Sequence, residues 1–169
     1  ASIVTRFIGE AAGVASSPAL TPADFVALGI SGVTAENLAE VLIAIRASAD
    51  DGSAIDTLTE VRTLVDTAVA LSRQNAIDTI SRYDGTSATT TPTLADFANA
   101  GVTGVTNGNL VSINSAFAVI GIADSDATEE IQGLVSGYVT ILLGADGQRD
   151  SDVSLSSSDY VAMNLARVD

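Results

Sequence analysis

The chain has 169 residues, of which 47% are hydrophobic and only 4% aromatic, and it contains neither Cys nor His. The lack of Cys excludes disulfides, thiol nucleophiles and Cys-based zinc sites, and the lack of His removes the usual general base near neutral pH. The formal charge is −14 and every basic residue is Arg, which disfavours nucleic acid and anionic membrane surfaces as partners.

A core of Leu, Ile, Val and Ala favours an all-α fold, because a β-sandwich would use more aromatic and β-branched pairs. The sequence has no run of about 20 apolar residues, so we expect no membrane span. The acidic, Lys-free surface suits a cation-rich medium such as a cell exterior. The alternative explanation for the acidity is only that it keeps the surface soluble.

The sequence repeats itself. The segment Asp24–Thr34, DFVALGISGVT, aligns with Asp96–Thr106, DFANAGVTGVT, and a third copy starts at Asp159. The spacing between the starts of successive copies is typical of one small helical module and exceeds that of a solenoid turn.

Each copy opens with a capping-box pattern, [ST]-x-x-D, that predicts the start of a helix. The pairs are Thr21 with Asp24, Thr93 with Asp96, and Ser156 with Asp159. We therefore interpret these Asp residues as structural rather than as ligands. Five positions later stands a residue that tolerates the left-handed conformation, so this first helix should end after about two turns. These residues are Gly29, Gly101 and Asn164.

A second helix should follow, with Thr34 and Thr106 as its N-caps. Apolar residues then recur at helical spacing in both copies. They are Leu38, Val41, Leu42 and Ile45 in the first copy, and Leu110, Ile113, Phe117 and Ile120 in the second.

A third helix is predicted from another set of apolar residues at helical spacing. The set is Ile55, Leu58, Val61, Leu64, Val65 and Ala68 in the first copy, and Ile131, Leu134, Val135, Tyr138 and Leu142 in the second. In the first copy the pattern continues through Ile77 and Ile80 to Tyr83. This helix either breaks near Ser72-Arg73 or continues as a long helix that joins two modules. The Thr-rich residues 86–91 then form a link.

We therefore predict an all-α fold of tandem small three-helix-bundle repeats, with a long shared helix as one alternative. The predicted domains are residues 1–19, the tail of a preceding helical repeat and a linker; 20–85, repeat 1; 86–152, repeat 2; and 153–169, the start of repeat 3. The chain thus begins and ends within repeats. Either it is a piece of a longer array, or its terminal helices complete a module non-sequentially.

The pattern resembles the albumin-binding GA-type three-helix modules of bacterial surface proteins, and similar repeats occur in large adhesins. The matching segments are Leu28–Ser31, Asn37-Leu38 and Val61-x-x-Leu64-Val65, with Ala100–Thr103, Asn109-Leu110 and Ile131-x-x-Leu134-Val135 in the second copy. The resemblance implies the three-helix topology, and we transfer no binding residues from it.

We identify no catalytic, cofactor-binding or metal-ligating residue. Ser156–Ser158 offer hydroxyl groups, but the chain has no His or Lys to activate them. Calcium is the one ion considered, at Asp146–Asp152, at Asp50-Asp51 and at Asp124 with Asp126. None of these segments has the EF-hand order of ligands. The alternative is that they are solvated turns whose acids favour the N-terminus of the next helix.

These features predict a non-enzymatic structural or adhesive repeat of a bacterial surface or secreted protein, extracellular or at the cell surface. It would act as a spacer or a weak multivalent binder, in contact with neighbouring repeats of the same chain. The alternative is a discrete module that recognises a host or matrix protein through a helical face. The apolar residues Phe117, Val119, Ile120 and Ile122 belong either to the core or to such a face.

Overall fold

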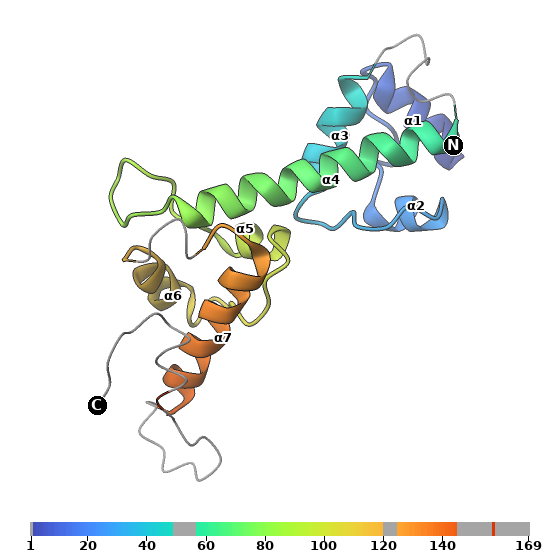
Figure 1. Ribbon diagram of the computed structural model, residues 1–169. Coiled ribbons are helices and arrows are strands. Elements are labelled where there is room, and N and C mark those ends of the chain that lie inside the picture. Colours follow the sequence, from blue (N-terminus) through green and yellow to red (C-terminus); the bar gives the residue numbers. More distant parts are fainter. Residues whose placement is uncertain (1, 49–56, 120–124, 145–156, 158–169) are drawn as a thin grey trace. The chain divides into compact units, whose positions relative to one another are not determined.

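The computed structural model describes residues 2–48, 57–119, 125–144 and 157, and over this part of the chain the protein is all-helical, as predicted. The helices are shown in Figure 1. They are α1 (Ile3–Ala11), α2 (Pro22–Ala27), α3 (Leu38–Arg46), α4 (Leu58–Ser81), α5 (Leu94–Asn99), α6 (Leu110–Phe117) and α7 (Thr128–Gly144). None of these described helices is both long and apolar enough to cross a membrane.

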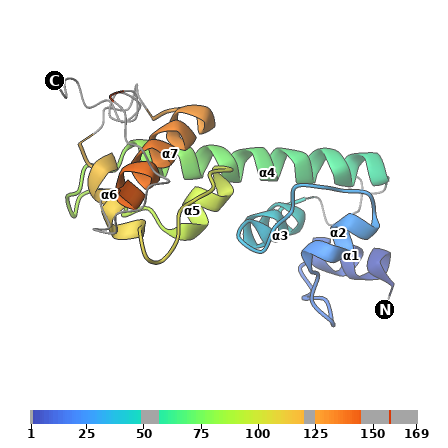
Figure 2. The ribbon, with the colours of Figure 1, turned by 90° about the horizontal axis from the view of Figure 1, so that it is seen from below.

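The chain divides into two compact units, residues 1–72 and 73–169, and the boundary falls inside α4. This helix spans 24 residues and passes Ser72 and Arg73 without a break, as Figures 1 and 2 show. Of the two alternatives for the third helix, the structure therefore has the continuous one. The predicted repeat boundaries at residues 19/20, 85/86 and 152/153 concern the sequence period and stay a prediction.

The core of the first unit is made by α1, α2, α3 and the first half of α4. The rings of Phe7 in α1 and Phe25 in α2 meet edge to face, with centroids 5.0 Å apart. The other buried apolar residues of this core are Ala11, Leu20, Ile30, Val33, Val41, Ile45, Val61, Val65 and Ala68. Residues 1–19, which the sequence period gives to a preceding repeat, thus contribute Phe7 and Ala11 to this core.

The core of the second unit is made by the last turns of α4 together with α5, α6 and α7. Phe97 and Phe117 also meet edge to face, with ring centroids 5.8 Å apart. The other buried apolar residues are Ala76, Ile77, Ile80, Ala100, Val102, Ile113, Ile131, Leu134 and Val135. Nearly all predicted apolar positions in the described residues are buried or half-buried, but Leu58, at the start of α4, is 48% exposed.

The short helices α2 and α5 begin and end as predicted. The Asp24 carboxylate accepts a hydrogen bond from Thr21 N at 2.9 Å, and the Asp96 carboxylate accepts one from Thr93 N at 2.7 Å. Gly29 and Gly101 have φ angles of 71° and 82°, which only glycine adopts at low cost. The corresponding residues of the third copy, Ser156, Asp159 and Asn164, lie outside the described residues.

The predicted N-caps of the second helices are wrong by three residues. Helices α3 and α6 begin at Leu38 and Leu110, with Asn37 and Asn109 as N-caps in place of Thr34 and Thr106. The reason is a turn closed by the Asn side chain. Oδ1 of Asn37 accepts from Thr34 N at 2.9 Å, and its Nδ2 donates to the Gly32 carbonyl at 2.9 Å. Asn109 makes the same two bonds to Thr106 and Gly104.

Candidate functional site

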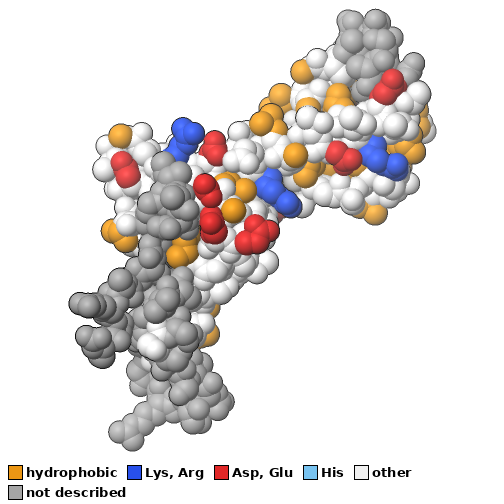
Figure 3. All heavy atoms as spheres, in the orientation of Figure 1, with side chains coloured by type: hydrophobic (Ala, Val, Ile, Leu, Met, Phe, Trp, Pro, Cys, Tyr) orange, Lys and Arg blue, Asp and Glu red, His pale blue; other side chains and the backbone are white. Residues whose placement is uncertain are grey.

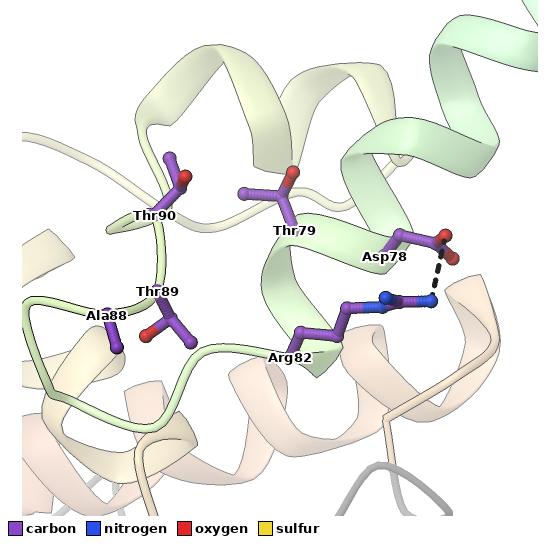
Figure 4. A pocket seen from close by; sticks show the side chains of 6 residues that line it. All are labelled: Asp78, Thr79, Arg82, Ala88, Thr89 and Thr90. Atoms are coloured by element: carbon purple, nitrogen blue, oxygen red, sulfur yellow. Dashed lines mark ion pairs between the residues drawn. The ribbon is translucent and has the colours of Figure 1, made fainter.

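The second unit has a hollow of about 310 Å³ that is a candidate binding site. It lies between the last turns of α4 and the segment that follows, as Figure 4 shows. Its lining residues are Asp78, Thr79, Arg82, Ala88, Thr89 and Thr90. It is wide open to solvent and most of its lining residues are polar, so any ligand held there would remain largely hydrated.

The wall after α4 is held in place by Asp84. Its Oδ1 atom accepts hydrogen bonds from Thr89 Oγ1 at 2.6 Å, from Thr86 Oγ1 at 2.7 Å and from Thr86 N at 2.9 Å. The Thr89 hydroxyl, followed by the Thr86 hydroxyl and N–H, lowers the pKa of Asp84 from 3.8 to about 2. The next residue, Gly85, has a φ of 75°, which lets the chain reverse here. The Thr-rich link is thus a folded turn around one carboxylate.

The charged residues of the hollow are only loosely paired. Arg82 Nη2 lies 3.7 Å from Asp78 Oδ2, and the two side chains are 71% and 46% exposed. An ion pair this exposed contributes little to stability and leaves the guanidinium accessible. The Thr79 hydroxyl donates to the Asn75 carbonyl. The Thr89 hydroxyl donates to the Asp84 carboxylate, which is a weak base because its pKa is lowered to about 2. The hollow can offer hydrogen bonds and one positive charge.

The first unit holds a buried acidic group. Glu10 is 2% exposed, and its carboxylate accepts from Ser16 N and Ser16 Oγ, each at 2.9 Å, and from Arg46 Nε at 2.9 Å. Burial raises the pKa of Glu10, but the bonds from Ser16 and Arg46 outweigh it and the net shift is downward. These contacts tie α1 to the segment between α1 and α2 and to α3, so the group is structural.

A second ion pair in this unit, between Arg6 and Asp24, stabilises the start of α2. Arg6 of α1 binds the Asp24 carboxylate with both of its terminal nitrogens, and Arg6 Nη1 also donates to the Ala19 carbonyl at 3.2 Å. The Arg6 hydrogen bonds, followed by the Thr21 N–H, lower the pKa of Asp24 from 3.8 to about 2. The interpretation of Asp24 as a structural cap is consistent with these contacts.

Sequence reasoning did not single out Glu10, Arg46, Asp84 or Arg82. A weak signal was present for Glu10, which occupies a core position of the amphipathic α1, three residues after Phe7. The Asp84-Gly85 pair by itself is typical only of a turn or a helix end. Its role depends on the path of the backbone, which brings Thr86 and Thr89 to the same oxygen.

The calcium candidates fall mainly on undescribed parts of the chain. Asp50-Asp51, Asp124 and Asp146–Asp152 lie outside the described residues, and so do Ser156 and Ser158. Asp126 is described and is exposed to solvent. Within residues 2–48, 57–119 and 125–144, no three Asp or Glu side chains are grouped so that they could hold a metal ion.

Large apolar side chains that stay exposed are spread over most helices. They are Val4, Ile8, Val14, Val26, Ile43, Leu58, Leu71, Val111, Val119 and Leu143. On the face drawn in Figure 3, hydrophobic side chains are interspersed with polar ones. The apolar stretch that begins at Phe117 is split: Phe117 is in the core, Val119 is 83% exposed, and Ile120 and Ile122 lie outside the described residues.

Comparison of the chain with models of protein families, with curated protein sequences and with solved structures gave no significant match.

Proposed function

We propose that the protein is a non-enzymatic structural or adhesive repeat of a bacterial surface or secreted protein, built from tandem three-helix modules. The observation that carries this proposal is the recurrence of the same backbone-stabilising contacts in both units. Unrelated helical units have no reason to share the residues that close their turns. Tandem copies of one module do share them.

The recurrence begins with the short helices. In each unit an Asp carboxylate caps the helix, a glycine with positive φ ends it, and the next residue donates back to the Phe carbonyl five positions earlier. This last bond is Ile30 N to Phe25 O at 2.9 Å in one unit, and Val102 N to Phe97 O at 2.8 Å in the other. Together these contacts define the same helix-ending motif twice.

The recurrence continues in the turn before the second helix. Asn37 and Asn109 each bridge the backbone N–H of a threonine and the carbonyl of a glycine, with matching lengths of 2.7 to 2.9 Å. An Asn side chain is needed here because it offers a donor and an acceptor at once. This pair supports a common origin of the two turns better than hydrophobic spacing does.

The third helices hold the short helices in a related way. Arg62 of α4 donates to the Gly29 carbonyl at 3.3 Å. Gln132 of α7 accepts from Thr103 N at 2.8 Å and donates to the Thr103 carbonyl at 3.2 Å. In both units a long polar side chain thus binds the backbone just after the short helix, although the residue types differ.

The surface supports a spacer or weak multivalent role. The net charge of −14 favours a soluble surface, and the salt of an extracellular medium weakens the repulsion between its acidic groups. The hollow beside Arg82 is open and polar, and the carboxylate bonded to its Thr89 hydroxyl, Asp84, is a weak base. A role at the cell surface or outside the cell is part of this proposal, with neighbouring repeats as the contacts.

A discrete protein-binding module is the second candidate. It is favoured by Val111 and Val119, which are 77% and 83% exposed in and just after α6. Exposed valines on one helical segment could anchor a protein partner. In this case a host or matrix protein would be recognised through the surface of α6.

A binding screen separates the two candidates. The immobilised chain is exposed to serum albumin, immunoglobulin and fibronectin, with and without millimolar calcium. The spacer role predicts no saturable binding at micromolar concentrations. Saturable binding that is lost in Val111→Gln/Val119→Gln, and kept in the control Val26→Gln, would establish the binding module. Hydrolysis of a generic ester, glycoside or peptide substrate by the pure chain would overturn both.

A further inference from the structure

The last turn of α7 ends in two adjacent leucines that its own core does not bury. Leu142 is half-buried and Leu143 is 54% exposed, although Leu134 and Val135, two turns earlier, are 6% and 0% exposed. Figure 1 shows this turn at the end of the orange helix. Two adjacent apolar side chains at a helix end form a surface on which another apolar segment can pack.

The other two helices that precede a capping motif, α1 and α4, each place an apolar residue in the core of the short helix that follows. Phe7 of α1 lies 14 residues before the N-cap Thr21. Ile80 of α4 lies 13 residues before the N-cap Thr93. Both are buried, at 4% and 0% exposed, in the core that contains the following short helix.

The two leucines of α7 stand at the equivalent positions before the third capping motif, which opens at Ser156. Leu142 lies 14 residues before Ser156, the same separation as between Phe7 and Thr21. Leu143 lies 13 residues before Ser156, the same separation as between Ile80 and Thr93. The end of α7 therefore corresponds in sequence to Phe7, in the middle of α1, and to Ile80, in the last turn of α4, and both are buried in the core of the next short helix.

The residues that meet Phe7 and Ile80 have counterparts after Ser156. Phe25 stands four residues after Thr21, and Phe97 four residues after Thr93; each packs in the same core as the helix end. Tyr160 stands four residues after Ser156. Leu20, just before the first cap, is 2% exposed, and Leu155 takes the same position in the third copy.

We propose that the last turn of α7, through Leu142 and Leu143, is the docking surface for residues 155–165 of the same chain, with Leu155 and Tyr160 as the anchors. This inference rests on the tandem-repeat organisation proposed above and adds where the third copy attaches. Each third helix then serves two cores, its own and that of the next repeat. The wider consequence is that neighbouring repeats of this type are coupled through a shared helix.

Fluorescence tests the docking directly, because the chain contains no Trp. In a Tyr160→Trp variant of the full chain, the only tryptophan should emit at a shorter wavelength than in the guanidinium-unfolded chain and be protected from acrylamide. Adding Leu142→Gln/Leu143→Gln should move the emission towards the unfolded value. The matched control Val111→Gln/Val119→Gln should leave it unchanged. Far-UV circular dichroism checks that α7 stays helical in each variant.

Three results would overturn the proposal. The first is a tryptophan as exposed as in the unfolded chain, together with fast amide hydrogen exchange at residues 158–165 of the unmodified protein. The second is a buried tryptophan that does not respond to the substitutions in α7. The third is burial that depends on protein concentration, which would assign the surface to a second copy of the chain. The binding screen is independent of all three, so failure of docking and failure of the proposed function are distinguishable.

Discussion

Single residues whose side chains hydrogen-bond to the backbone help to set the ends of the described helices. Asp24, Asp96, Asn37 and Asn109 each bind backbone N–H groups that a helix or a tight turn would otherwise leave unpaired. These bonds span three residues or so, and they form wherever the local sequence allows. Their effects on stability should therefore be local and measurable one residue at a time.

The Thr93 cap is the clearest case, because the Thr93 hydroxyl accepts from Asp96 N while the Asp96 carboxylate accepts from Thr93 N. We expect Thr93→Ala to lower the free energy of unfolding by about 1 kcal/mol, the usual cost of losing an N-cap hydroxyl. Urea denaturation measures it. The control is Thr90→Ala, an exposed residue of the same segment, which should change little. An equal loss in both variants would contradict the capping role.

The Asp24 ion pair predicts a pH dependence. The pKa of Asp24 is lowered to about 2 in the folded protein, from an ordinary value of 3.8, so the unfolded chain takes up the proton first as the pH falls. The stability that Asp24 contributes is thus present above about pH 5 and is lost between there and about pH 2. Melting temperatures should separate the wild type from Asp24→Asn near neutral pH and converge at the acid end. A gap that stays constant over this range would contradict the prediction.

Among the elements, α4 is the one whose two halves belong to different cores. Val61, Val65 and Ala68 pack in the first core, and Ala76, Ile77 and Ile80 in the second. Between them stand exposed or polar residues such as Leu71, Ser72 and Arg73, which the helical pattern alone could not distinguish from a break. The helix continues because nothing in this stretch disfavours the helical backbone: it contains neither Gly nor Pro.

Continuity of α4 can be tested at Arg73, which is exposed. We expect Arg73→Pro to lower the free energy of unfolding by about 3 kcal/mol, because proline removes an internal hydrogen bond and clashes with the preceding turn. Arg73→Ala, the control, should be nearly neutral. Urea denaturation with the helical circular dichroism signal compares the two. If the proline variant were as stable as the alanine variant, the helix would have to be interrupted at this point.

Taken as a whole, the described part of the molecule has two separate sets of buried apolar residues, and no residue belongs to both. Each set has an edge-to-face phenylalanine pair, but the partner differs: Phe25 meets Phe7 of α1, whereas Phe97 meets Phe117 of α6. Damage to one core should therefore be felt first in its own unit.

Phe25→Ala and Phe97→Ala test this separation. Each should lower the stability of its own unit by about 3 to 5 kcal/mol, the usual cost of removing a buried phenylalanine. Amide hydrogen exchange followed along the chain should speed up mostly in α2 and α3 for the first variant, and mostly in α5 and α6 for the second. Equal acceleration in both units by either variant would show that they unfold as one cooperative body.

Much of the local structure could be predicted from the sequence, and the errors have clear physical causes. The start and end of α2 and α5 follow from Thr, Asp and Gly at fixed offsets, since the hydrogen bonds involved are only a few residues long. The N-caps at Thr34 and Thr106 were wrong because Asn37 and Asn109 compete for the same backbone groups and close a turn first. The hollow at Arg82 had no sequence signal, because its walls meet only after the chain reverses around Asp84.

The sequence by itself determined that the described chain is helical, where its short helices lie and which face of each helix is apolar. Helical periodicity identifies the buried face without naming its partner, so it could not assign Phe7 and Ile80 to the cores that contain Phe25 and Phe97. Nor could it show that Glu10 would be buried against Ser16 and Arg46. Only the tertiary structure decided these matters, because hydrophobic burial is non-directional and the partner depends on how the whole chain packs.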